Sequence, residues 1–183
     1  MSTISISALL FIIIISIWLS LFFAINQQIV TTAQTTEPNF VPYSNPTFGI
    51  KIEYPADWGR LDLSFQLNNS ADIDFYPLDD SSGSKHLRIQ VETILSAQNM
   101  TFDQFNVAKI NSAEGQVLES NSTSLAGLPA HEIVITTDLL KSMQLWTIKD
   151  NKAYTITYVA EVEDFQSDLQ VAQSMIESFQ ITS

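Results

Sequence analysis

The chain has 183 residues, no cysteine and a formal net charge of −12 at pH 7. Without cysteine there is no disulfide framework, no thiolate nucleophile and no cysteine-based metal site, so a packed core has to stabilise the fold. The acidic surface repels nucleic-acid phosphates and anionic lipid headgroups, so we expect no nucleic-acid partner.

The N-terminal stretch is apolar. The segment Ile4–Ile25 has no ionisable side chain, and about 20 such residues are enough for a helix to cross the hydrocarbon core of a bilayer. Residues 1–33 are therefore predicted to be a cleaved signal peptide or a retained N-terminal membrane anchor, in either case a hydrophobic helix. The small residues Thr31 and Ala33 favour cleavage before Gln34, whereas the length of the apolar run favours retention.

Both alternatives predict that the rest of the chain lies outside the cytoplasm, secreted or anchored to a membrane. Residues 34–45 are polar and are predicted to be a linker. Residues 46–183 are predicted to form one domain, large enough to bury about two-thirds of the surface of its unfolded chain. The first basic residue is Lys51, so flanking charges predict no membrane orientation.

Alternation of apolar and polar residues predicts a set of strands in the first half of this domain. They are expected at Phe48–Tyr54, Leu61–Leu67, Ile73–Pro77 and His86–Leu95. An acidic, serine-rich loop, Leu78–Lys85, precedes the last of them.

A helix is predicted to begin at Thr101. Thr101 and Gln104 have the spacing of a capping box, and Met100 and Phe105 have the spacing of a hydrophobic staple. Gly115 is the expected stop. After it, strands are predicted at Val117–Asn121 and His131–Thr137, on either side of a turn at Leu125–Ala130.

The stretch Met143–Glu161 predicts a β-hairpin. Asp150 and Asn151 tolerate the positive φ of a tight turn, and a loop at these two residues places Leu145 opposite Ile156 and Thr147 opposite Tyr154. One face of the hairpin is then apolar throughout. The other face mixes Trp146, Ile148, Ala153 and Val159 with Gln144, Thr155 and Thr157. A hairpin that is apolar on both faces is expected inside a covered sheet.

The last predicted element is a helix from about Asp164 to Phe179, because Phe165, Leu169 and Ala172 begin an apolar stripe. Carboxylates crowd its start, where the helix dipole favours them. The order of the elements predicts an α+β fold, an antiparallel sheet with helices packed on its faces.

Four stretches carry a family resemblance: YSNPTFGIKIEYPADW (43–58), SLAGLPAHEI (124–133), WTIKDNKAYTITYVAE (146–161) and MIESFQI (175–181). In this order they resemble the PsbP-like family, whose best-known member is the extrinsic photosystem II subunit of the oxygen-evolving complex. The stretches span nearly the whole domain. The resemblance implies an α-β-α sandwich around an antiparallel sheet.

The resemblance also implies a class of function. Family members are mostly non-enzymatic extracytoplasmic modules that dock on membrane complexes, and the photosystem member helps to retain calcium and chloride. This sequence departs from that member in its apolar leader, its strongly acidic surface and its few lysines. The departures indicate a non-photosynthetic, prokaryotic member.

The main hypothesis is a non-enzymatic extracytoplasmic module that binds or helps to assemble a membrane-associated complex. Its expected partners are a protein and, if the N-terminal segment is uncleaved, the membrane. The alternative is a carrier or sensor that holds a small ligand or calcium. No catalytic residue and no cofactor are predicted, because the sequence has no nucleophile elbow and no glycine-rich phosphate loop. An enzyme would require His86 or His131 in a cleft beside an acidic residue.

Calcium is the one metal that the sequence suggests. Calcium binds six to eight hard oxygen ligands, and Asp72, Asp74, Asp79 and Asp80 lie in or beside the acidic loop. The spacing differs from that of an EF-hand loop. These four residues are the candidate ligands.

Three sequons begin at Asn68, Asn99 and Asn121. Such sequons are acceptors for N-glycosylation in exported proteins. They are the candidate modification sites.

Overall fold

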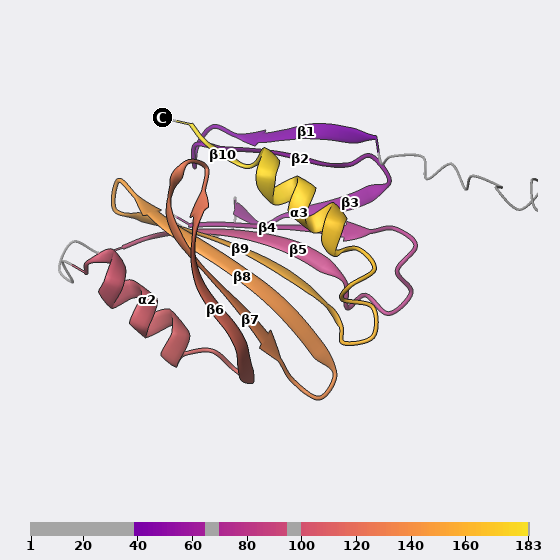
Figure 1. Ribbon diagram of the computed structural model, residues 1–183. Coiled ribbons are helices and arrows are strands. Elements are labelled where there is room, and N and C mark those ends of the chain that lie inside the picture. Colours follow the sequence, from indigo (N-terminus) through magenta and orange to yellow (C-terminus); the bar gives the residue numbers. More distant parts are fainter. Residues whose placement is uncertain (1–38, 65–69, 95–99, 183) are drawn as a thin grey trace, which may run out of the picture. The chain divides into compact units, whose positions relative to one another are not determined.

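The computed structural model describes residues 39–64, 70–94 and 100–182 (Figure 1). The strands are β1 (Phe40–Asn45), β2 (Ile50–Pro55), β3 (Trp58–Asp62), β4 (Ser70–Pro77), β5 (His86–Thr93), β6 (Gln116–Leu125), β7 (Leu128–Thr136), β8 (Leu140–Lys149), β9 (Lys152–Glu161) and β10 (Gln180–Ile181). The helices are α2 (Phe102–Asn111) and α3 (Leu169–Ser178). The predicted hydrophobic helix in residues 1–33 lies outside the described residues. Among those described, no helix is long and apolar enough to span a membrane.

The strands form two antiparallel sheets. A seven-stranded sheet has the order β3-β4-β5-β9-β8-β7-β6, and a three-stranded sheet has the order β1-β2-β10. The predicted α+β class with an antiparallel sheet is confirmed, and the second, small sheet is an addition to it.

The β8–β9 hairpin is the centre of the large sheet. Asp150 and Asn151 have φ values of 51° and 60°, as a tight hairpin turn requires. Leu145 lies opposite Ile156 and Thr147 opposite Tyr154, so the predicted register is confirmed. The sequence specifies this register because a shift by one residue would move every apolar side chain to the other face.

Both faces of the large sheet carry other elements, and α2 covers only part of its face (Figure 1). On one face, a core that includes Ile156 and Tyr158 packs against the small sheet and α3. On the other, Trp146 and Ala153 pack with Phe105 of α2. The expected α-β-α sandwich is therefore present, with the three-stranded sheet lying beside α3 in one outer layer.

Helix α2 begins as predicted. The Thr101 side chain accepts a hydrogen bond from the Gln104 backbone N–H, and the Gln104 side chain accepts one from the Thr101 backbone N–H. These two bonds satisfy backbone donors that have no partner within the helix. The helix ends earlier than predicted, with Ser112 as its C-cap rather than at Gly115.

The prediction of a polar linker up to residue 45 is wrong for Phe40–Asn45, which is strand β1. This strand forms because it pairs with β2 along its whole length, a contact that its own composition does not encode. Tyr43 fixes it to the large sheet, since its hydroxyl donates a 2.5 Å hydrogen bond to Asp62 Oδ2 of β3. Burial and this bond raise the pKa of Tyr43 to about 12.

Several other boundaries differ from the prediction. The strand expected at Phe48–Tyr54 is β2, Ile50–Pro55, and the strand expected at Leu61–Leu67 is β3, which begins at Trp58 and ends at Asp62. Residues between Glu161 and Asp168 form turns rather than the start of the last helix, and α3 begins at Leu169. The turn between β6 and β7 consists of Ala126 and Gly127 alone, both with positive φ, so these two strands are longer than predicted.

Candidate functional site

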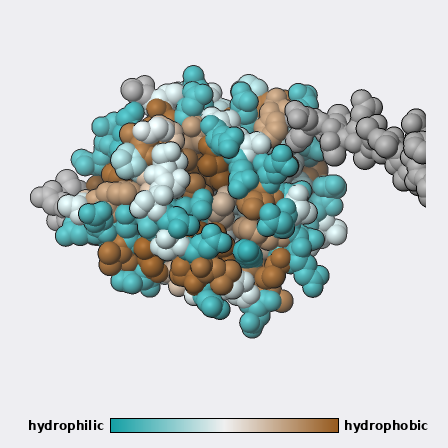
Figure 2. Space-filling model, in the orientation of Figure 1, coloured by the Kyte–Doolittle hydropathy of each residue, from teal (hydrophilic) through white to brown (hydrophobic). Residues whose placement is uncertain are grey.

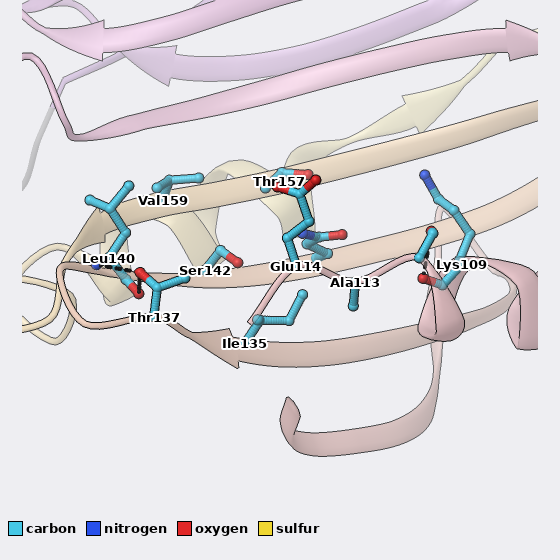
Figure 3. A pocket seen from close by; sticks show the side chains of 11 residues that line it. Lys109, Ala113, Glu114, Ile135, Thr137, Leu140, Ser142, Thr157 and Val159 are labelled. Atoms are coloured by element: carbon cyan, nitrogen blue, oxygen red, sulfur yellow. Dashed lines mark hydrogen bonds between the residues drawn. The ribbon is translucent and has the colours of Figure 1, made fainter. Parts of the chain in front are cut away.

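A groove of about 360 Å³ opens beside the C-terminal end of α2 (Figure 3). Residues of β7, β8 and β9 form its floor, and Lys109 of α2 and Glu114 of the segment after the helix also line it. We call it the α2 groove. The residues that line it are Lys109, Ser112, Ala113, Glu114, Ile135, Thr137, Leu140, Ser142, Gln144, Thr157 and Val159.

The groove exists because α2 is only ten residues long. The helix covers the half of the sheet face that carries Trp146 and Ala153, and the other half is left open beyond the helix end. On β8 and β9, Gln144 lies directly opposite Thr157 and Ser142 directly opposite Val159. The alternation of the two strands therefore sets polar groups side by side on the groove floor.

The polar side chains of the groove floor are available for hydrogen bonds. Within the described residues, Ser142, Gln144 and Thr157 have no side-chain hydrogen bond to another protein group. A neutral amide and two hydroxyls can both donate and accept hydrogen bonds, and Lys109 and Glu114 add one charge of each sign. This arrangement is suited to binding polar groups of a ligand or of another protein.

A second groove of about 430 Å³ lies along the other side of α2. It shares Lys109 and Ser112 with the α2 groove, and its remaining lining is more apolar, including Ile94, Met100 and Phe105. The two grooves thus flank one helix on the same face of the sheet.

An apolar edge borders the α2 groove. It consists of Leu139, Leu140 and Val162: Leu140 lines the groove, and the Val162 backbone N–H donates to the Leu139 carbonyl. The Leu139 side chain is 77% exposed. Figure 2 shows hydrophobic residues gathered along the lower edge of the view, over the end of the molecule where Figure 1 places α2 and the β7–β8 turn. Exposed apolar surface next to a polar groove is typical of an interaction site.

The four candidate calcium ligands do not converge. Asp72 and Asp74 on β4 face Arg88 of β5, whose Nε and Nη2 donate to the two carboxylate oxygens of Asp74 at 2.7 and 2.8 Å. Asp80 accepts hydrogen bonds from Ser82 and from the Lys85 backbone N–H, which close its loop. Asp79 is exposed. Across the described ranges no three His, Cys, Asp or Glu residues group as metal ligands, and calcium binding stays a prediction.

The two histidines lie apart. His86 is half-buried at the start of β5, and burial lowers the pKa of its imidazole against the opposing effect of Asp74. His131 on β7 has Nε2 2.9 Å from Ser120 Oγ, and its ring centroid is 5.4 Å from that of Trp146. Neither histidine lines the α2 groove or the second groove.

Of the three sequon asparagines, Asn121 lies within the described residues. Asn121 is exposed at the middle of β6. Asn68 and Asn99 lie outside the described residues. Glycosylation at these positions stays a prediction.

The α2 groove is a feature that the sequence does not predict. Its floor residues Gln144 and Thr157 belong to the mixed face of the hairpin, and polar residues on an otherwise apolar strand face are the one signal of an opening there. Whether such a face is open depends on where α2 ends, and the capping-box pattern fixes only where that helix begins.

Comparison with known proteins supports the fold. The sequence matches the model of a family described as PsbP-like protein over residues 6–181. No curated protein matches the sequence. The solution structure of cyanobacterial PsbP (CyanoP) from Synechocystis sp. PCC 6803 superposes with a TM-score of 0.58 at 13% identity, covering 84% of this chain and 99% of that one.

Two further structures share the fold. A protein from Bacteroides thetaiotaomicron VPI-5482 has a TM-score of 0.52 at 12% identity, covering 78% of this chain and 48% of that one. LpqN, involved in cell envelope biogenesis of Mycobacterium tuberculosis, has a TM-score of 0.50 at 16% identity, covering 80% of this chain and 92% of that one. At these identities the likeness concerns the fold, and function does not follow from it.

Proposed function

Because this chain belongs to the PsbP-like protein family, we propose that it is a non-enzymatic, extracytoplasmic module that binds a protein of a membrane-associated complex. The apolar segment at residues 4–25 supports export of the domain, as a secreted or a membrane-anchored form. LpqN, which shares the fold, is involved in cell envelope biogenesis, and a role in a cell envelope rather than in a photosystem suits the acidic surface and the few lysines of this chain.

The observation that carries the proposal is the α2 groove with its apolar edge. Protein interfaces combine a desolvated apolar centre with polar groups that make hydrogen bonds around it. Leu139 and Leu140 supply exposed apolar surface, and Gln144 and Thr157 supply free hydrogen-bonding groups a short way along the same sheet face. A partner that covers the apolar edge can therefore also make hydrogen bonds to the polar side chains of the groove floor.

We predict that Leu139→Glu abolishes capture of the partner. Cross-linking in intact membranes that contain the whole 183-residue chain, followed by its purification, is expected to recover one specific protein with the wild type. A carboxylate in the desolvated centre of an interface costs several kcal/mol when unpaired, so recovery is expected to fall at least about tenfold.

Leu78→Glu is the matched control, because Leu78 is 70% exposed on the loop after β4, outside the α2 groove and the apolar edge. The control is expected to recover as much partner as the wild type. Equal losses in the two variants, or no stable partner with the wild type, would contradict the proposal.

A second candidate function is a carrier or sensor for a small ligand. Its specific support is the volume and the free floor groups of the α2 groove, since ligand sites are concave and contain a few placed polar groups. Calcium binding at Asp72, Asp74, Asp79 and Asp80 belongs to the same alternative. Calorimetric titration with calcium, together with thermal unfolding in its presence, tests calcium binding. Binding heat and a raised Tm would support a site, and the absence of both at millimolar calcium would exclude calcium binding.

A further inference from the structure

Strand β6 is an open sheet edge. It is ten residues long, lies at the end of the seven-stranded sheet, and has only Leu125 buried. In the part of the chain that the structure describes, no strand pairs with its outer side. Natural edge strands are usually short or carry lysine or proline, which discourage pairing with another chain. The sequence of β6, QVLESNSTSL, contains neither. A β-bulge between Val117 and Glu119 interrupts only its first part, and the pairing with β7 is regular from Glu119 to Leu125.

The register of the β6–β7 hairpin shows which backbone groups point outward. The two turn residues, Ala126 and Gly127, have φ values of 51° and 75°, so the pair that closes the turn, Leu125 and Leu128, exchanges both of its hydrogen bonds. In an antiparallel ladder bonded and non-bonded pairs alternate. The groups that point away from β7 therefore belong to Ser120, Ser122 and Ser124.

Pro129 agrees with this assignment. It lies opposite Ser124, and proline has no N–H to donate to β6. In a non-bonded pair neither residue donates to the opposite strand, so the missing N–H of Pro129 removes no hydrogen bond between β6 and β7. The open edge thus presents regularly spaced donors and acceptors from Ser120 to Ser124.

The charges beside β6 favour a basic segment. Glu119 of β6 lies close to Glu132 of β7. Burial, and after it the negative charge of Glu119, raises the pKa of the Glu132 carboxyl. The ion pairs of the described residues involve other carboxylates, those of Asp72, Asp74 and Asp168. A lysine or arginine brought alongside would relieve this repulsion. A second copy of the chain would instead add another Glu119 and another net charge of −12.

We propose that β6 accepts an extended, lysine- or arginine-bearing segment of the partner protein as an eighth strand of the large sheet. This inference rests on the proposed function and names the chemistry of the partner. Backbone hydrogen bonds to Ser120, Ser122 and Ser124 supply affinity, as in other cases of strand addition. The acidic pair Glu119 and Glu132 selects a basic segment.

The test uses a capped synthetic peptide of alternating threonine and lysine, with a matched peptide in which glutamate replaces lysine. Binding to the whole chain in mild detergent is followed by the Kd and by protection of the β6 amides from hydrogen exchange. The lysine peptide is expected to bind and to protect Ser120, Ser122 and Ser124, and the glutamate peptide is expected not to bind.

Two variants at one position separate the backbone from the side chain. Ser122→Pro removes an outward N–H and leaves the β7 ladder intact, so its Kd is expected to rise about tenfold. Ser122→Ala keeps the N–H and is expected to bind as the wild type does. In the double variant Glu119→Gln, Glu132→Gln, which leaves the backbone untouched, the preference for the lysine peptide is expected to disappear. This variant keeps the test decisive if the proline variant fails to fold.

Equal binding of the lysine peptide to the proline and alanine variants would overturn the inference. Protection confined to the α2 groove would also overturn it, as would self-association of the chain that Ser122→Pro abolishes, because the occupant would then be a second copy. If the Ser122→Pro variant still captures the membrane partner at the wild-type level, the inference fails while the proposed function stands. Loss of capture by Leu139→Glu and not by Ser122→Pro leads to the same conclusion.

Discussion

Replacing Trp146 with alanine is expected to lower the free energy of unfolding by about 3–5 kcal/mol, the usual cost of removing a large buried aromatic side chain. Trp146 is fully buried on the face that α2 covers, packed with Phe105, Ile133 and Ala153. Its indole Nε1–H donates a 2.7 Å hydrogen bond to Asn106 Oδ1 of α2. The substitution therefore removes both the packing and the polar contact that hold α2 on the sheet.

Equilibrium denaturation in urea measures the effect. Trp146→Phe is the matched control, because it keeps most of the apolar volume and loses only the indole hydrogen bond, at an expected cost of about 1–3 kcal/mol. If Trp146→Ala cost less than the phenylalanine variant, or nothing, then α2 would not be fixed by this contact and the α2 groove would have no rigid wall.

Replacing Phe75 with alanine is expected to cost a similar amount, about 3–5 kcal/mol, on the opposite face of the sheet. Phe75 of β4 is fully buried, and its ring centroid lies 5.7 Å from that of Tyr43 and 4.8 Å from that of Tyr54. Those two tyrosines belong to β1 and β2. Phe75 is therefore one of the side chains through which the small sheet packs on the large one, and hydrogen exchange in β1 and β2 is expected to accelerate together with the loss of stability.

Tyr76 provides the control on the same strand. It follows Phe75 directly and faces the other side of the sheet, where it is partly exposed. Tyr76→Ala is expected to cost about 1 kcal/mol or less. Comparable losses for the two variants would contradict the assignment of Phe75 to the contact between the sheets.

The fold was predictable where local chemistry and long-range packing agree. The β8–β9 hairpin is such a case, because the turn residues Asp150 and Asn151 and the alternation on both strands demand one register. The start of α2 is another, since the capping box at Thr101 is a local pattern. Strands β1 and β10 are the opposite case: each forms by pairing with β2, and neither has an alternation long enough to predict it.

The candidate site was less predictable than the fold. The carboxylates in and beside the acidic loop are the most conspicuous polar groups of the sequence, and they suggest a calcium site. In the structure, Asp74 accepts two hydrogen bonds from Arg88 within the sheet. The α2 groove depends on the length of one helix, and the open edge depends on β6 being last in the strand order. Both are consequences of topology, which residue types along the chain do not reveal.

The central claim is that this domain works by contact through the side of the sheet that carries α2 and β6. Hydrogen exchange of the whole 183-residue chain, with and without membranes that contain its partner, tests this most directly. We predict slower exchange in residues 102–125 and around Leu139, with β1 and β2 unchanged. Slower exchange confined to β1 and β2, or no change anywhere in the domain, would contradict it.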